Sequence, residues 1–123
     1  MKPGKTGIAR LIDACGYSGK GLAAAFRHEA AFRQELLLFV ILTGVSFWFA
    51  ASVFEWLVLI VPLFILLIVE LLNSAIENTV DRIGSELNEL SGRAKDMGSA
   101  AVMISLILIA VCWGSIIWIH YHS

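Results

Sequence analysis

Charged residues, cysteines and prolines are all scarce in this chain. Only 15% of the 123 residues are charged, against about 25% in soluble proteins, and 59% are hydrophobic, against about 45–50%. That much apolar surface exceeds what a small water-soluble core can bury. The two cysteines, Cys15 and Cys112, lie far apart with no histidine or cysteine at ligand spacing, which argues against a zinc site and favours two small apolar residues.

Several common catalytic motifs are also absent. The sequence has no DFG segment, no GxSxG elbow and no HExxH pair. Residues 16–21 (GYSGKG) look like a phosphate loop at first sight, but the GxxxxGK[ST] spacing is not met. The histidines His28, His120 and His122 are isolated in the sequence. The first 25 residues lack the compact apolar stretch of a signal peptide, so we expect the whole chain to be retained.

Three long apolar segments dominate the rest of the chain. Residues 36–54 and 97–119 carry no charge, and residues 56–69 are apolar up to Glu70. A helix needs about 20 residues to cross the hydrocarbon of a bilayer. We therefore predict one all-α membrane domain over residues 1–123, with spans at about 31–54, 56–80 and 96–119. A soluble bundle is the alternative, but three such segments leave too little polar chain to cover them.

The segments that flank the spans have their own patterns. Residues 51–55 are all that separates the first two spans, so these must form a helical hairpin. At the N-terminus, Ile8, Leu11, Ile12 and Cys15 follow helical spacing, which predicts an amphipathic helix over about residues 7–27 on the membrane surface. We expect residues 16–21 to interrupt it and residues 22–35 to form a second helical stretch that leads into the first span. A solvated basic leader is the alternative.

Positive charges occupy only two regions of the chain, the N-terminal segment and the loop between spans two and three. They are Lys2, Lys5, Arg10, Lys20, Arg27 and Arg33 in the first region, and Arg82, Arg93 and Lys95 in the second. The positive-inside rule places both regions in the cytoplasm, and the hairpin and the C-terminus outside.

The aromatic residues agree with this topology. Trp56, Trp118 and Tyr121 lie at the outer ends of their spans, where an aromatic belt is expected. Trp48 and Trp113 lie deeper, so we expect them to be packing residues.

Polar residues form a stripe on the second span. At about 100° per residue, Asn73 lies about 60° from Glu70, while Glu77 and Asp81 return to within about 20° of it. An ionisable residue at membrane depth costs about 2.5–3.5 kcal/mol and normally faces a bundle interior or a wet cavity. The stripe therefore predicts a functional site. Polar contacts that hold an oligomer together are the alternative.

Further polar groups gather at the same side of the membrane. The loop after the second span holds carboxylates, amides and cations, and the N-terminal segment adds Glu29 and Glu35. Mg²⁺ commonly takes one or two carboxylates together with substrate phosphates, and Lys or Arg neutralises the remaining phosphate charge. The pattern predicts a magnesium–phosphate site at the cytoplasmic edge.

Four stretches give a more specific indication. EAAFRQE (29–35), ELLNSAIE (70–77), VDRIGSE (80–86) and ELSGRAKDMGSAAV (89–102) closely resemble the integral-membrane diacylglycerol kinases of Gram-negative bacteria. The resemblance covers the chain from about Arg10 to the C-terminus. It implies a homotrimer in the bacterial inner membrane that transfers the γ-phosphoryl group of MgATP to the primary hydroxyl of diacylglycerol. It implies no nucleic-acid partner.

The resemblance also implies individual residue roles. Glu70 would be the general base, Glu29 and Glu77 would bind Mg²⁺, and Asn73 would support the site. ATP contacts would come from Arg10, Tyr17, Glu29, Glu77, Glu86, Asn88, Lys95 and Asp96. Lipid contacts would come from Arg10, Ala31, Phe32, Arg33, Gln34, Glu35, Trp48, Glu70 and Ser99.

Two other functions are compatible with the residues. Undecaprenol kinases share the fold and chemistry, and apolar side chains discriminate weakly between lipids. The second compatible function is that of a non-enzymatic membrane oligomer or ion conduit. A conduit needs polar residues through the full membrane depth, whereas residues 56–69 are apolar.

Overall fold

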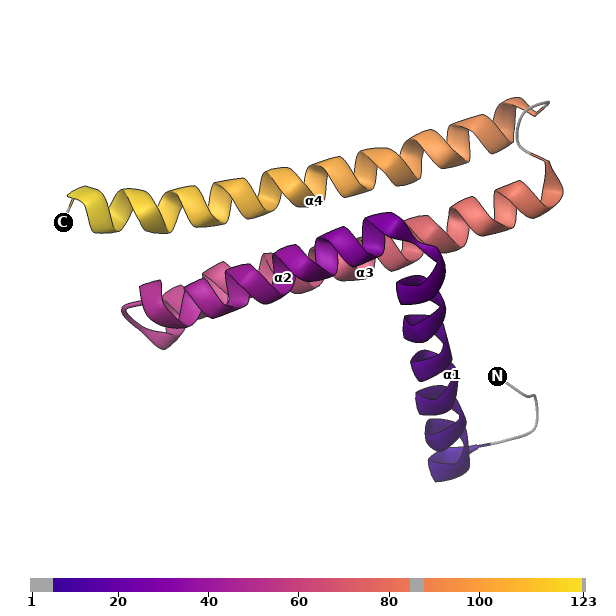
Figure 1. The fold of residues 1–123 in the computed structure, drawn as a ribbon, viewed down its shortest axis with the longest axis horizontal. Helices are drawn as coiled ribbons and strands as arrows, with labels where there is room; N and C mark the ends of the chain where they lie inside the picture. The colour runs from indigo at the N-terminus through magenta and orange to yellow at the C-terminus, as the bar shows by residue number, and fades with distance from the viewer. Residues whose placement is uncertain (1–5, 85–87, 123) are drawn as a thin grey trace.

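The structure, a computed structural model, describes residues 6–84 and 88–122. Its described residues form the helices α1 (Gly7–His28), α2 (Ala30–Phe49), α3 (Val53–Ile83) and α4 (Glu89–His122). α2, α3 and α4 lie side by side as an elongated bundle, and α1 leaves it sideways (Figure 1). The three bundle helices are each long and apolar enough to cross a membrane. The predicted all-α fold with three spans and an N-terminal helix is confirmed.

α1 is one continuous helix, so the expected interruption at residues 16–21 is wrong. Glycine in a helix costs only about 1 kcal/mol relative to alanine, which the neighbouring helix formers offset here. Local contacts span the stretch: Ser18 Oγ donates to the carbonyl of Ala14 at 2.8 Å, and Lys20 Nζ lies 5.8 Å from the ring centroid of Tyr17. The expected second helical stretch over residues 22–35 is therefore also wrong.

The chain turns instead at Glu29, between α1 and α2. Glu29 has an extended backbone (φ −114°, ψ 106°), and its N–H still donates to the carbonyl of Ala25 at 2.9 Å. The Arg33 guanidinium donates to the carbonyls of Phe26 (2.8 Å) and Arg27 (3.3 Å), which the end of α1 leaves without helical partners. This elbow, at residues 26–33, sets the direction in which α1 leaves the bundle (Figure 1).

The predicted hairpin between the first two spans is confirmed. It turns over residues 50–52, where the Ser52 hydroxyl accepts from the N–H of Glu55 at 3.1 Å and the Glu55 carboxylate accepts from the N–H of Ala51 at 3.0 Å. These reciprocal contacts resemble a capping box. The same carboxylate lies 2.6 Å from His120 Nε2, which ties the start of α3 to the end of α4.

α3 is the central helix, and its apolar contacts hold the bundle together. Leu63 and Leu66 form a buried cluster with Ile109 of α4. Pro62 removes a backbone donor within α3. One turn before it, the carbonyl of Leu59 accepts from the Trp113 indole at 2.9 Å.

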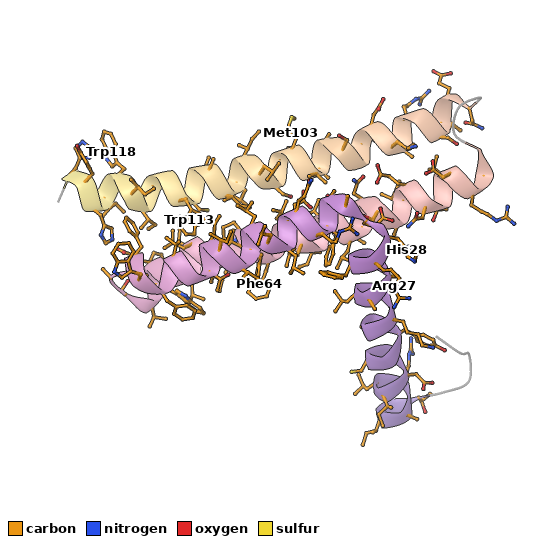
Figure 2. The ribbon with its side chains drawn as sticks, in the orientation of Figure 1. Arg27, His28, Phe64, Met103, Trp113 and Trp118 are labelled. Atoms are coloured by element: carbon orange, nitrogen blue, oxygen red, sulfur yellow. The ribbon has the colours of Figure 1, made fainter. Side chains whose placement is uncertain are left out.

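The two deeper tryptophans differ. Trp113 packs against the core cluster from α4, as expected (Figure 2). Trp48 is 88% exposed, so the expectation that it packs within the chain is wrong. Trp48 is the penultimate residue of α2, and its side chain points away from the other helices of the chain.

Candidate functional site

The polar stripe of α3 is buried at its inner end. Glu70 is only 2% exposed, and the hydroxyl of Ser74, one turn later, donates to Glu70 Oε2 at 3.1 Å. Ser74 is itself 4% exposed. Because both partners are buried and water competes little for the bond, it fixes the direction of the Glu70 carboxyl group.

Glu35 of α2 meets Glu70 across the helix interface. The two carboxyl groups lie close enough to interact electrostatically. Glu35 Oε2 is buried with no hydrogen-bond partner among the described residues. The pair therefore places an unused acceptor beside the buried Glu70 carboxyl group.

Asn73 faces the other neighbour of α3. It is 8% exposed, and its Oδ1 lies against Gly98 of α4 without a hydrogen-bond partner in the described part of the chain. Asp81 also reaches α4, where Lys95 Nζ donates to its Oδ1 at 2.9 Å. The stripe thus contacts α2 at Glu70 and α4 at Asn73 and Asp81.

The elbow brings Glu29 beside the same part of α3. Asn78 Nδ2 donates to Glu29 Oε2 at 3.4 Å, which places Glu29 beside the turn that carries Glu77. A cavity of about 560 Å³ opens between α1 and α3 at this point. Its lining includes Ser18 and His28 of α1, Glu29 itself, and Ser74 and Asn78 of α3. Arg27 and His28 mark the adjoining last turn of α1 in Figure 2.

Glu29 and Glu77 have the ligand chemistry that a magnesium–phosphate complex uses. The described residues contain no cluster of three or more His, Cys, Asp or Glu side chains that could enclose a metal without help. Two hard carboxylates that complete their shell with phosphate oxygens match the usual preference of Mg²⁺. The residues present therefore fit a metal that is bound together with a nucleotide.

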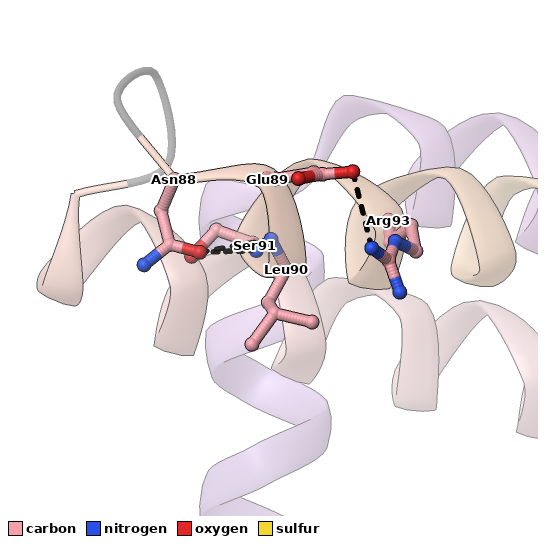
Figure 3. Close-up of polar contacts among 5 residues, drawn as sticks. All are labelled: Asn88, Glu89, Leu90, Ser91 and Arg93. Carbon is pink, nitrogen blue, oxygen red and sulfur yellow. Dashed lines mark hydrogen bonds and ion pairs between the residues drawn. The ribbon is translucent and has the colours of Figure 1, made fainter.

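The start of α4 carries the remaining polar groups. Asn88 Oδ1 accepts from the N–H groups of Leu90 (2.8 Å) and Ser91 (3.2 Å), and so caps the helix (Figure 3). Arg93 pairs with Glu89 at 3.1 Å on the exposed surface (Figure 3). Asp96 and Ser99 follow on exposed positions. Because the Asn88 amide oxygen is used in the cap, the group of this side chain that can contact a ligand is its amide nitrogen.

The structure does not bring all the sequence-predicted site residues together. Arg10 and Tyr17 lie on the part of α1 that projects from the bundle (Figure 1). Trp48 lies at the far end of α2, next to the hairpin. In the first turn and a half of α2, Ala31 and Gln34 are exposed and Phe32 is 3% exposed. Glu86 lies outside the described residues.

Three site residues escaped the sequence analysis. Ser74 could have been found from its spacing, because residues four apart on a helix are neighbours. Asn78 follows Glu77 directly, but its contact with Glu29 depends on the elbow and is visible only in the structure. Gly98 carries no functional group, so only its contact with Asn73 identifies it.

The fold and the site together define a class: a three-span α-helical membrane protein with a carboxylate-rich polar site at one end of its bundle. The model of the prokaryotic diacylglycerol kinase family matches residues 16–117. The diacylglycerol kinase of Escherichia coli K12 is 49% identical over 121 residues, 98% of this chain and 99% of that protein. The diacylglycerol kinase of Pseudomonas aeruginosa PAO1 is 52% identical over 114 residues, 93% of each chain.

A third relative, the diacylglycerol kinase of Haemophilus influenzae Rd, is 45% identical over 113 residues, 92% of this chain and 96% of that protein. The chain belongs to the prokaryotic diacylglycerol kinase family. The family resemblance predicted from the four sequence stretches is confirmed, and with it the class of enzyme, a kinase.

Proposed function

We propose that this protein transfers the γ-phosphoryl group of ATP to the primary hydroxyl of diacylglycerol and so makes phosphatidic acid. The observation that carries the proposal is Glu70, a buried carboxylate that accepts a hydrogen bond from Ser74 at the polar end of a membrane bundle. A lipid hydroxyl can meet a water-soluble nucleotide only at the membrane interface. The kinase family of the chain supplies the reaction class.

Glu70 acts as the general base in this proposal. The lipid hydroxyl oxygen forms a bond to the γ-phosphorus, the bond from that phosphorus to the ADP oxygen breaks, and the hydroxyl proton passes to Glu70. Phosphoryl transfer asks the protein mainly for positioning and charge neutralisation, which a fixed carboxylate and nearby cations provide.

The nucleotide would lie on the water-facing side of Glu70. Glu29 and Glu77 would hold Mg²⁺, which when bound neutralises phosphate charge and orients the phosphoryl group. Lys95 and Asp96 would contact ATP from the start of α4. Further ATP contacts are proposed for Arg10, Tyr17, Glu86 and Asn88.

The lipid would approach along α2. Residues 31–35 border Glu70 through the contact of Glu35, and Arg10, Trp48 and Ser99 are proposed as further lipid contacts. Asn73 is proposed to support the base from the next turn of α3. Because Trp48 is 88% exposed near the opposite end of α2, its contact would be with the acyl chains.

We further propose a homotrimer in the bacterial inner membrane, with the N-terminus and the loop between α3 and α4 in the cytoplasm and the C-terminus in the periplasm. The support is the distribution of positive charge and the family of the chain.

A lipid-phosphorylation assay with purified protein in mixed micelles tests the function. We expect transfer of labelled phosphate from ATP to diacylglycerol, and no labelled lipid in micelles without an acceptor. Phosphorylation of undecaprenol in preference to diacylglycerol would overturn the substrate assignment. No transfer to either lipid by folded protein would overturn the kinase proposal and favour a non-enzymatic oligomer. The apolar packing of Leu63, Leu66 and Ile109 counts against a conduit within one chain.

A further inference from the structure

The Asn73 side chain of α3 lies directly against Gly98 of α4 near the candidate site. Gly98 is buried, and a Cβ atom built on it would fall well inside van der Waals distance of Asn73 Oδ1. The same atom would lie 3.3 Å from Asn73 Cγ and 3.9 Å from Asn73 Cα. Any residue other than glycine at position 98 must therefore displace the Asn73 amide.

The contact with Gly98 explains how the Asn73 amide oxygen can be buried without a conventional hydrogen bond, which would otherwise be energetically unfavourable. Asn73 Oδ1 is buried and has no conventional donor among the residues that the structure describes. One Cα hydrogen of Gly98 points toward it, and Cα–H···O contacts recur where membrane or soluble helices approach closely. Ala94 and Ala101, about one turn to either side of Gly98 on α4, line a cavity of about 340 Å³ that Asn73 and Gly98 also border. Gly98 thus holds one orientation of the amide.

The position of this contact connects the two halves of the site. Asn73 lies three residues after Glu70 on α3, and Gly98 lies three residues after Lys95 on α4. A further polar contact between these helix segments joins Lys95 and Asp81, whose side chains are 35% and 58% exposed. Exposed ion pairs contribute little to rigidity. The buried Asn73–Gly98 contact is therefore the firmer link between the proposed base and the proposed nucleotide side.

We propose that Gly98 is a positioning residue for phosphoryl transfer, which acts by seating the Asn73 amide between the helix of Glu70 and the helix of Lys95. This inference rests on the proposed function. The Cβ of an alanine would meet chiefly the end of a side chain, not backbone. The cheapest response is rotation of the Asn73 amide, which leaves the helices in place. Gly98→Ala should therefore damage turnover more than folding.

Gly114 provides a matched control on the same helix. A Cβ there would meet nothing within 4 Å in the described part of the chain. We expect Gly98→Ala to lower kcat about tenfold or more, with the KM for ATP within about twofold and an unfolding midpoint in detergent no lower than that of the parent. Gly114→Ala should keep the kcat of the parent. Full kcat in Gly98→Ala, or a kcat loss accompanied by an equal loss of folded protein, would overturn the proposal.

A double-mutant cycle tests whether the effect passes through Asn73. In an Asn73→Ala background the amide is gone, so Gly98→Ala should change the remaining turnover less than twofold. An undiminished tenfold loss in that background would overturn the positioning role. Glu70→Gln in the same assay keeps the two proposals apart. If Glu70→Gln retains turnover, the base assignment fails. The coupling between positions 73 and 98 is measured separately, from the parent, the two single variants and the double variant.

Discussion

The hydroxyl of Ser74 offers a direct test of how the base is held. Ser74→Ala removes the donor that lies 3.1 Å from Glu70 Oε2 and leaves the rest of α3 unchanged. Both residues are less than 5% exposed, so water cannot easily replace the bond. A hydrogen bond to a charged group contributes about 1.5–3 kcal/mol. If most of that energy serves to orient Glu70 in the transition state, kcat should fall about ten- to a hundredfold, at a factor of ten per 1.4 kcal/mol.

The assay is ATP-dependent phosphorylation of diacylglycerol in mixed micelles, with kcat measured at saturating lipid. Ser74→Thr keeps a hydroxyl and should recover much of the activity. Ser105→Ala is the matched control, because Ser105 is equally buried but donates to the backbone carbonyl of Ala101 within its own helix. Parental kcat in Ser74→Ala, or an equal loss in Ser105→Ala, would refute the reasoning.

Two further changes test the cation site and the packing of the bundle. Glu77→Gln should raise the Mg²⁺ concentration needed for half-maximal activity severalfold, with partial recovery at excess Mg²⁺, because one hard ligand is lost; an unchanged Mg²⁺ dependence would exclude this role. Trp113→Phe should lower the free energy of unfolding in detergent by about 0.5–1.5 kcal/mol, because the indole hydrogen bond between α4 and the Leu59 carbonyl of α3 is lost. Trp118→Phe, at an exposed ring, is the control, and an equal loss there would contradict the assignment.

The main elements of the fold follow from the sequence because membrane helices obey simple rules. Long apolar runs predicted the three bundle helices, and the short segment at residues 51–55 predicted the hairpin. The position of the break near the N-terminus could not be predicted from glycine content. Gly16, Gly19 and Gly21 only weaken a helix, whereas the actual break at Glu29 depends on Arg33 reaching back to carbonyls of α1.

The sequence predicted which residues of the site share one helix, but not which residues of the other helices they contact. Helical spacing placed Glu70, Asn73 and Glu77 along one side of a helix, because the periodicity of one helix is local information. Spacing could not say which neighbour each side chain meets. Glu70 contacts α2 through Glu35, and Asn73 contacts α4 at Gly98. Such pairings depend on how helices distant in sequence pack, and a glycine that acts by leaving space has no sequence signal of its own.

The base role of Glu70 is the central claim, and Glu70→Gln tests it most directly. Glutamine keeps the size of the side chain and one acceptor oxygen but cannot accept the lipid proton. Glu89→Gln is the matched control, since Glu89 is an exposed carboxylate paired with Arg93. The account predicts that Glu70→Gln loses lipid phosphorylation by at least a thousandfold while it still binds MgATP, measured by equilibrium binding, and that Glu89→Gln stays active. Substantial turnover in folded Glu70→Gln would contradict it.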